Sequence, residues 1–172
     1  KMMGIEAVKS STPAPCRTMI KDALKLMMRG TEDDVIEFIE NARKEFKSLP
    51  PEEIAFPRTA SNVQKYKSSS DIYVKGTPIH IRGALLFNYY LRKKKLTNKY
   101  SAIENGEKIK FLYLKKPNTI QENVLSFIQD FPTEFGLSQY IDYELQFEKS
   151  FVYPLKAILD AIGWEVEKKV TL

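Results

Sequence analysis

The stretch Pro78-Ile79-His80-Ile81-Arg82-Gly83-Ala84-Leu85-Leu86-Phe87-Asn88-Tyr89-Tyr90-Leu91-Arg92-Lys93-Lys94-Lys95 dominates both the fold and the charge of the central part of the chain. Its apolar residues recur at helical spacing, which predicts a helix over residues 79–94. Residues 75–116 around it hold eleven lysines and arginines but two glutamates, a net charge of +9 against +5 for the whole chain. Because the positive charge is concentrated in the centre of the chain, the electric field of the protein is one-sided. A field of this kind raises encounter rates with nucleic acids or anionic membrane surfaces.

Length and composition predict one domain, or one domain with an appendage. The chain has 172 residues, of which 43% are hydrophobic, enough for a substantial core. Cys16 is the single cysteine, so no internal disulfide forms, and no apolar run approaches the roughly 20 residues that span a bilayer. We therefore expect a cytoplasmic protein, in the host cytoplasm if it is viral. The start at Lys1 carries no signal peptide and indicates a cut from a longer protein.

Two helices are predicted in the N-terminal part, after a strand over residues 2–8. Thr12 is the expected N-cap of the first helix, with Pro13 at its first position, and Gly30 is expected to end it in a left-handed cap. Thr31 and Asp34 have capping-box spacing and start the second helix. Because only a short link joins the helices, they should form an antiparallel hairpin.

The sequence after these two helices predicts both strands and helices. For the chain as a whole we therefore expect an α+β fold that is mainly helical. Residues 54–56 and 108–115 are strand candidates, the second with lysines on its solvent side, after a turn at Gly106. Residues 142–162 show a helical stripe that ends at Gly163. Pro154 falls inside it, which predicts a kink or two shorter helices.

Residues for catalysis are scarce. His80 is the only histidine, and Cys16 falls in an apolar stripe, which favours a buried structural thiol over a nucleophile. Zinc binding is improbable with one cysteine and one histidine. The acidic pairs Asp33-Asp34 and Glu52-Glu53 fall near helix starts, where acids are common because of the helix dipole. We expect no catalytic residue, metal site or cofactor in this chain.

Three groups of residues carry a resemblance to a known family. They are Gly4-Ile5-Glu6 with Ser10-Ser11-Thr12-Pro13, then Pro78-Ile79-His80-Ile81-Arg82-Gly83-Ala84-Leu85, then Phe147-Glu148-Lys149-Ser150-Phe151-Val152-Tyr153-Pro154-Leu155. Together, in this order, they resemble the carboxy-terminal thumb of family B DNA polymerases of T-even-type bacteriophages. The resemblance extends over essentially the entire chain.

The resemblance implies a fragment or split subunit of a replicative DNA-directed DNA polymerase, with a strand and turn leaving the palm over residues 1–12 and the thumb over 13–172. Within the thumb, residues 13–48 and 124–163 would form a helical base and residues 50–123 a β-containing basic tip. The thumb would hold the primer–template duplex without catalysing, and Mg²⁺ would be bound by a palm that this chain lacks. Its partners would be duplex DNA and the palm and exonuclease portion. A sliding clamp would be a possible further partner, although the short apolar docking peptide that the family carries at its end is not expected here, where the sequence stops at Val170-Thr171-Leu172.

Eleven residues are the predicted DNA contacts. His80 and Arg82 would present a donor and a positive fork to adjacent phosphates if they lay on a strand or extended turn. The alternative for His80 and Arg82 is a capping role. A position at a solvated helix end explains Lys93 as well as a DNA contact does. N-capping explains Thr12 equally well. The remaining candidates are Ser10, Ser11, Asn88, Tyr90, Arg92, Lys108 and Lys149.

Two further functions remain open from the sequence. A module that docks on a replication partner needs the lysines only for solubility. A single-strand or RNA binder is favoured by tyrosines near lysines, at positions 89, 90, 100 and 113. Duplex binding through about five phosphate contacts predicts a log–log salt slope near −4 to −5.

Overall fold

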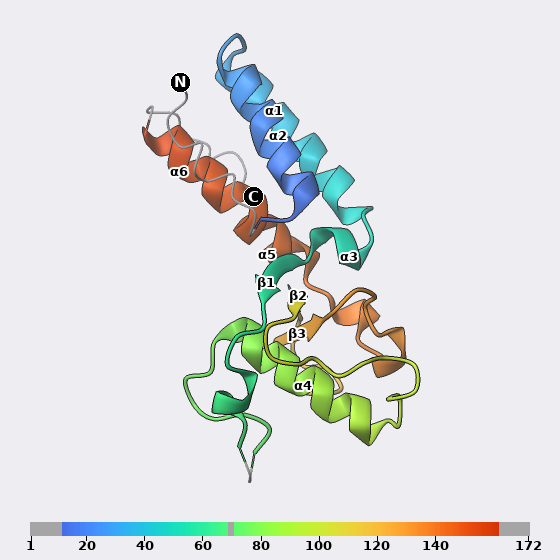
Figure 1. Cartoon of the computed structure of the whole chain (residues 1–172). Coiled ribbons are helices and arrows are strands. Elements are labelled where there is room, and N and C mark those ends of the chain that lie inside the picture. Colours follow the sequence, from blue (N-terminus) through green and yellow to red (C-terminus); the bar gives the residue numbers. More distant parts are fainter. Residues whose placement is uncertain (1–11, 69–70, 162–172) are drawn as a thin grey trace. The chain divides into compact units, whose positions relative to one another are not determined.

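A computed structural model describes residues 12–68 and 71–161, and within these residues the chain forms two compact units (Figure 1). The first unit joins the N-terminal segment up to Ile54 to the segment from Tyr143 onward, and the second runs from Ala55 to Asp142. The fold is α+β and mainly helical, as predicted. Residues 124–142 lie in the second unit, not with the helical base, because their strand pairs with the sheet there.

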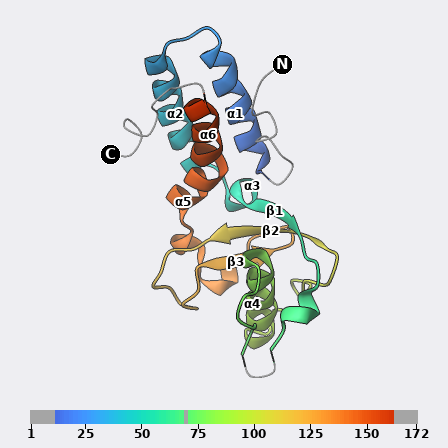
Figure 2. The same ribbon diagram turned by 90° about the vertical axis from the view of Figure 1, so that its left-hand side faces the viewer.

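The first unit is built on the predicted helical hairpin, α1 (Ala14–Met27) and α2 (Glu32–Lys47), whose buried faces pack on each other (Figure 2). The capping box is confirmed, since the Asp34 N–H donates to the Thr31 hydroxyl and the Asp34 carboxylate accepts from the Thr31 N–H. The N-cap prediction for Thr12 is wrong. Pro13 occupies the N-cap position, and Thr12 precedes it with a buried side chain.

The end of α1 also differs from the prediction. Met28, in a right-handed conformation, is the C-cap, and the Gly30 N–H bonds to the Leu26 carbonyl at 2.6 Å. Gly30 is not among the residues with positive φ. An added Cβ would lie 3.0 Å from the Leu26 carbonyl oxygen and 3.1 Å from an Asp34 carboxylate oxygen, so close approach explains the glycine here.

The C-terminal part of this unit is interrupted near Pro154, as predicted. It consists of α5 (Tyr143–Phe147), a π-helical turn over Glu148–Val152, and α6 (Tyr153–Ala161), and the short α3 (Pro51–Ile54) belongs to the same unit. A proline cannot donate a backbone hydrogen bond, and the π-helical turn ends at Val152, two residues before Pro154. Cys16 is buried, with its thiol 3.3 Å from the Ser150 hydroxyl, and burial raises its pKa to about 11.

The second unit contains an antiparallel sheet of order β1 (Phe56–Thr59), β2 (Lys108–Tyr113), β3 (Val124–Phe127), with α4 (Ile79–Lys93) packed across it (Figures 1 and 2). Helix α4 and strand β2 match the predicted elements. The strand expected at residues 54–56 begins two residues later, because Ile54 ends α3. Strand β3 was not predicted, since all four of its residues are buried and show no alternation. Short 3₁₀ turns complete the unit at Val63–Tyr66, Thr133–Phe135 and Ser138–Tyr140.

The contact between α4 and β3 depends on a glycine. Gly83 is buried against Ser126, whose hydroxyl donates to the His80 carbonyl at 2.8 Å. A Cβ at Gly83 would lie 2.4 Å from the Ser126 hydroxyl oxygen and 2.7 Å from its backbone nitrogen. The absence of a side chain therefore lets the helix approach the sheet closely, and this fixes the rotation of α4 about its axis.

Candidate nucleic-acid interface

One side of α4 carries cations and tyrosines in line. At 100° per residue, Arg82, Tyr89 and Lys93 fall within about 20° of one line along the helix, and they span about 16 Å of its axis. Tyr90 lies beside this line, and its ring contacts the Tyr89 ring and the Lys93 ammonium. We call Arg82, Tyr89, Tyr90 and Lys93 the basic face of α4.

Two tyrosines and a lysine form the C-terminal end of this face. The Tyr89 and Tyr90 rings pack edge to face, with centroids 4.9 Å apart and an interplanar angle of 86°. The Lys93 ammonium lies 5.7 Å from each ring centroid. A cation over an exposed aromatic face contributes about 0.5–1 kcal/mol, which orders the lysine without neutralising it. Burial raises the pKa of Tyr90, so its hydroxyl keeps its proton as a hydrogen-bond donor near neutral pH.

Arg82 lies at the other end and is held by residues from two loops. One guanidinium nitrogen is 3.5 Å from a Glu122 carboxylate oxygen, and the guanidinium carbon is 5.7 Å from the Tyr73 ring centroid. The Tyr73 hydroxyl is 2.9 Å from each oxygen of the same carboxylate. A separation of 3.5 Å is the long limit of a hydrogen bond, so the Arg82–Glu122 pair is weak. The guanidinium, with five N–H donors, can also serve an external anion.

His80 does not share a face with Arg82. Both residues lie in α4, where two positions correspond to about 200°, so the arrangement expected for a strand is wrong. The His80 ring instead lies 6.5 Å from that of Phe111, near Arg58. Burial lowers the pKa of His80, the positive charge of Arg58 lowers it further, and a hydrogen bond with the Thr59 backbone acts in the opposite direction.

Arg58 is a basic residue that the sequence did not indicate. Its guanidinium lies over the Phe111 and Phe56 rings, 5.2 and 5.6 Å from their centroids, and burial lowers its pKa. It is the single basic residue of the short strand β1, so no run of charged residues indicates it in the sequence. Its pairing with Ile109 of β2 places it in the sheet, and its electrostatic effect on His80 places it beside the first turn of α4.

The other predicted contacts are spread over different surfaces. Lys108 alternates with the β2 residues that face α4, so it belongs to the opposite side of the sheet. Asn88 is occupied by a structural role, because its amide donates to the Ile103 carbonyl at 3.0 Å and accepts from the Ile103 N–H at 2.7 Å. Arg92 is exposed on the side of the Arg82–Tyr89–Lys93 line opposite to Tyr90, about 80° from Arg82 around the helix.

Two predicted contacts involve the first unit, and two cannot be placed. Lys149 is exposed in the π-helical turn, and Thr12 is buried beside the start of α1. Ser10 and Ser11 lie outside the described residues, as do the predicted strand over 2–8 and Gly163. The predicted residues are therefore brought together only in part, along α4.

The described residues offer no metal centre and no membrane segment. Within 12–68 and 71–161, no group of three or more histidines, cysteines or acidic residues is arranged to hold a metal ion. In the same residues, every helix is too short or too polar to cross a bilayer.

The fold defines the class of protein to which the chain is similar. It matches a solved structure of the family B DNA polymerase from the hyperthermophilic archaeon Pyrobaculum calidifontis with a TM-score of 0.56 and 12% identity. The match covers 90% of this chain and 18% of that one. This is the fold of a segment of a family B DNA polymerase. No protein-family profile matches the chain.

Sequence comparison names the particular relatives. The chain is 28% identical over 176 residues to the DNA-directed DNA polymerase of Enterobacteria phage T4. It is 30% identical over 177 residues to that of Escherichia phage RB69. Each match covers the whole of this chain but 19% of the relative, so the chain spans about a fifth of the length of these polymerases. The predicted resemblance to family B polymerases of the T-even type is confirmed.

Proposed function

We propose that this chain is the thumb of a family B DNA polymerase and binds the primer–template duplex through its sugar–phosphate backbone. The whole-length similarity to two phage DNA polymerases supports this role. Phosphoryl transfer would be carried out by residues elsewhere in the polymerase, where Mg²⁺ would be held. The proposed partners are duplex DNA and the palm and exonuclease parts of the enzyme.

The observation that carries the proposal is the basic face of α4. Its length of about 16 Å corresponds to about five base pairs of B-DNA at 3.4 Å each. Arg82 at one end and Lys93 at the other would each neutralise a backbone phosphate, and the tyrosine hydroxyls between them would donate to phosphate or sugar oxygens. Such contacts fix position and carry no sequence information, so the duplex would be bound without sequence preference.

The remaining basic residues would extend this contact. Arg58 would supply a further cation beside the start of α4, and the lowered pKa of the neighbouring His80 would rise when an anion binds nearby. Lys108 and Lys149, on other surfaces, stay proposed phosphate contacts. Asn88 is better explained by its bonds to Ile103.

Fluorescence anisotropy with a labelled duplex of random sequence tests the proposal. The variant Arg82→Gln/Lys93→Gln loses two cations, so its log–log salt slope should be shallower than wild type by about 1.8. The control Lys25→Gln/Lys44→Gln removes two exposed cations of the first unit and should change the slope less. Absence of duplex binding at low salt, or equal slopes for the variant and wild type, would contradict the proposal.

Single-strand binding is the second candidate, and the Tyr89–Tyr90 pair favours it. Bases stack on exposed aromatic rings, which contribute about 1–3 kcal/mol per base. In a competition of unlabelled duplex against oligo-dT, duplex should displace the labelled duplex at lower concentration. If oligo-dT competes better, and Tyr90→Ala removes that advantage, the chain is a single-strand binder.

A further inference from the structure

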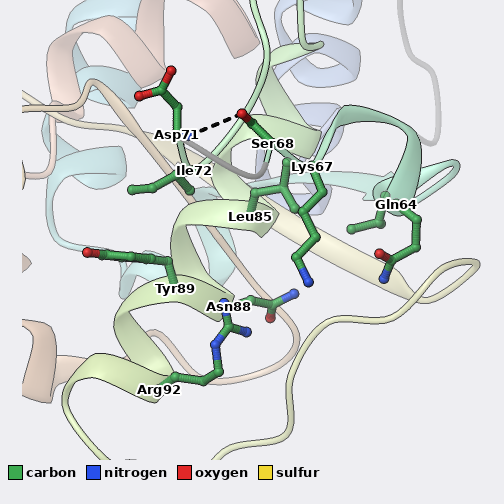
Figure 3. A pocket seen from close by; sticks show the side chains of 10 residues that line it. Gln64, Lys67, Ser68, Asp71, Ile72, Leu85, Asn88, Tyr89 and Arg92 are labelled. Carbon is green, nitrogen blue, oxygen red and sulfur yellow. Dashed lines mark hydrogen bonds between the residues drawn. The ribbon is translucent and has the colours of Figure 1, made fainter.

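A pocket of about 350 Å³ lies beside α4 in the second unit (Figure 3). It is lined by the 3₁₀ turn at Val63–Tyr66, by residues just before and after 69–70, and by α4. Val63 and Leu85 are buried and give it an apolar floor. Gln64, Lys67, Asn88 and Arg92 supply polar groups at its walls.

Helix geometry explains which side of α4 faces this pocket. Leu85, Asn88, Tyr89 and Arg92 follow one another at i, i+3, i+4 and i+7, so they share one side of the helix. This side is adjacent to the basic face of α4, with Tyr89 at the border. The two hydrogen bonds between the Asn88 amide and the Ile103 backbone hold this part of the wall in place.

Two cations point into the same space from different elements. Figure 3 shows the Lys67 amine and the Arg92 guanidinium converging near Asn88. Within residues 12–68 and 71–161, neither makes an ion pair with a carboxylate. Asp71 also lines the pocket, but its carboxylate lies at the opposite end and points away from both. Convergent like charges repel until an anion lies between them.

We infer that this pocket, the Lys67–Arg92 pocket, binds a phosphate group of a nucleic acid or nucleotide. The Arg92 fork can bind two phosphate oxygens side by side, and Lys67 adds a mobile point charge. The Gln64 amide lies in the pocket wall that the 3₁₀ turn forms, and the Tyr89 ring borders the site on the side of α4. A pocket of this size suits a small group and is too small for a folded partner. If the phosphate belongs to the DNA backbone, this inference rests on the proposed function and adds a further contact to it.

The test uses two probes, because the phosphate can belong to duplex DNA or to a free nucleotide. The variant is Lys67→Gln/Arg92→Gln, and both residues are exposed, so the fold should be kept. The control is again Lys25→Gln/Lys44→Gln, with the same charge change. If the source is the DNA backbone, the salt slope for random duplex becomes shallower by about 1.8 in the variant only. If it is a nucleotide, dAMP binding measured by calorimetry is lost in the variant and kept in the control.

The outcomes separate this inference from the proposed function. Should the pocket variant equal the control with both duplex and dAMP, the inference is overturned, even when Arg82→Gln/Lys93→Gln weakens duplex binding and the proposed function stands. Should wild type bind no duplex but bind dAMP in a manner that depends on Lys67 and Arg92, the pocket is supported and the proposed function falls.

Discussion

Replacing Gly83 with alanine should push α4 away from β3 and destabilise the second unit. The added Cβ would lie 2.4 Å from the Ser126 hydroxyl oxygen, 2.7 Å from the Ser126 nitrogen and 3.1 Å from the Leu125 carbonyl carbon. The hydroxyl can rotate away, but the two backbone atoms belong to a buried strand paired with β2. Relief therefore requires the helix or the strand to move.

The size of the effect follows from two opposing contributions. Overpacking in a close-packed core costs about 1–3 kcal/mol, and clash with backbone puts Gly83→Ala at the upper end. Alanine is preferred to glycine within a helix by about 1 kcal/mol, which offsets part of this. We expect a net loss of about 2 kcal/mol in the free energy of unfolding, or roughly 10 °C in Tm for a unit of this size.

Urea denaturation followed by circular dichroism, with amide hydrogen exchange in β2 and β3 to isolate the second unit, measures the loss. Gly76→Ala is the control, because its φ is +85° but nothing lies within 4 Å of its added Cβ. It should cost only the conformational strain of about 1–2 kcal/mol and leave the packing of α4 on β3 unchanged. Adding Ser126→Gly to Gly83→Ala should restore little, since the nitrogen at 2.7 Å remains. A Gly83→Ala protein as stable as wild type would show that the packing of α4 on β3 does not require a glycine at position 83.

Three further predictions concern single groups. Asn88→Ala leaves the Ile103 N–H and carbonyl without their partner and should lower the free energy of unfolding by about 2 kcal/mol, whereas a loss below about 0.5 would exclude a structural role. Thr31→Ala removes the hydroxyl that caps α2 and should cost about 1 kcal/mol in thermal unfolding of the first unit; no change in Tm would argue against the cap. His80 should titrate by NMR below 6.5, and Arg58→Gln should raise its pKa; an unchanged midpoint would leave burial as the sole cause. Because the unfolded chain takes up this proton first, the stability contribution is complete above pH 6.5 and is lost as the pH falls toward the folded pKa.

The elements that local patterns specify were predictable from the sequence. The capping box at Thr31 marks the start of α2, and the apolar spacing after Pro78 gives α4 within a residue of its observed end. Pro154 indicates the interruption near residue 150, though not that it is a π-helical turn. In each case, residues within about one helical turn determine the outcome.

What the sequence left undetermined depends on contacts between distant residues. Strand β3 is recognisable only through its pairing with β2, and Arg58 reaches His80 only because β1 joins the same sheet. The separation of His80 from Arg82 follows from their helical rather than extended backbone. The Lys67–Arg92 pocket likewise needs the chain before residue 69 to lie against α4.

An NMR map of the amide signals that shift when random-sequence duplex is added tests the central claim most directly. The largest shifts should fall on the basic face of α4, at Arg82, Tyr89, Tyr90 and Lys93, and should diminish as salt is raised. Shifts confined to the first unit, or a map that leaves α4 unchanged at low salt, would contradict the central claim.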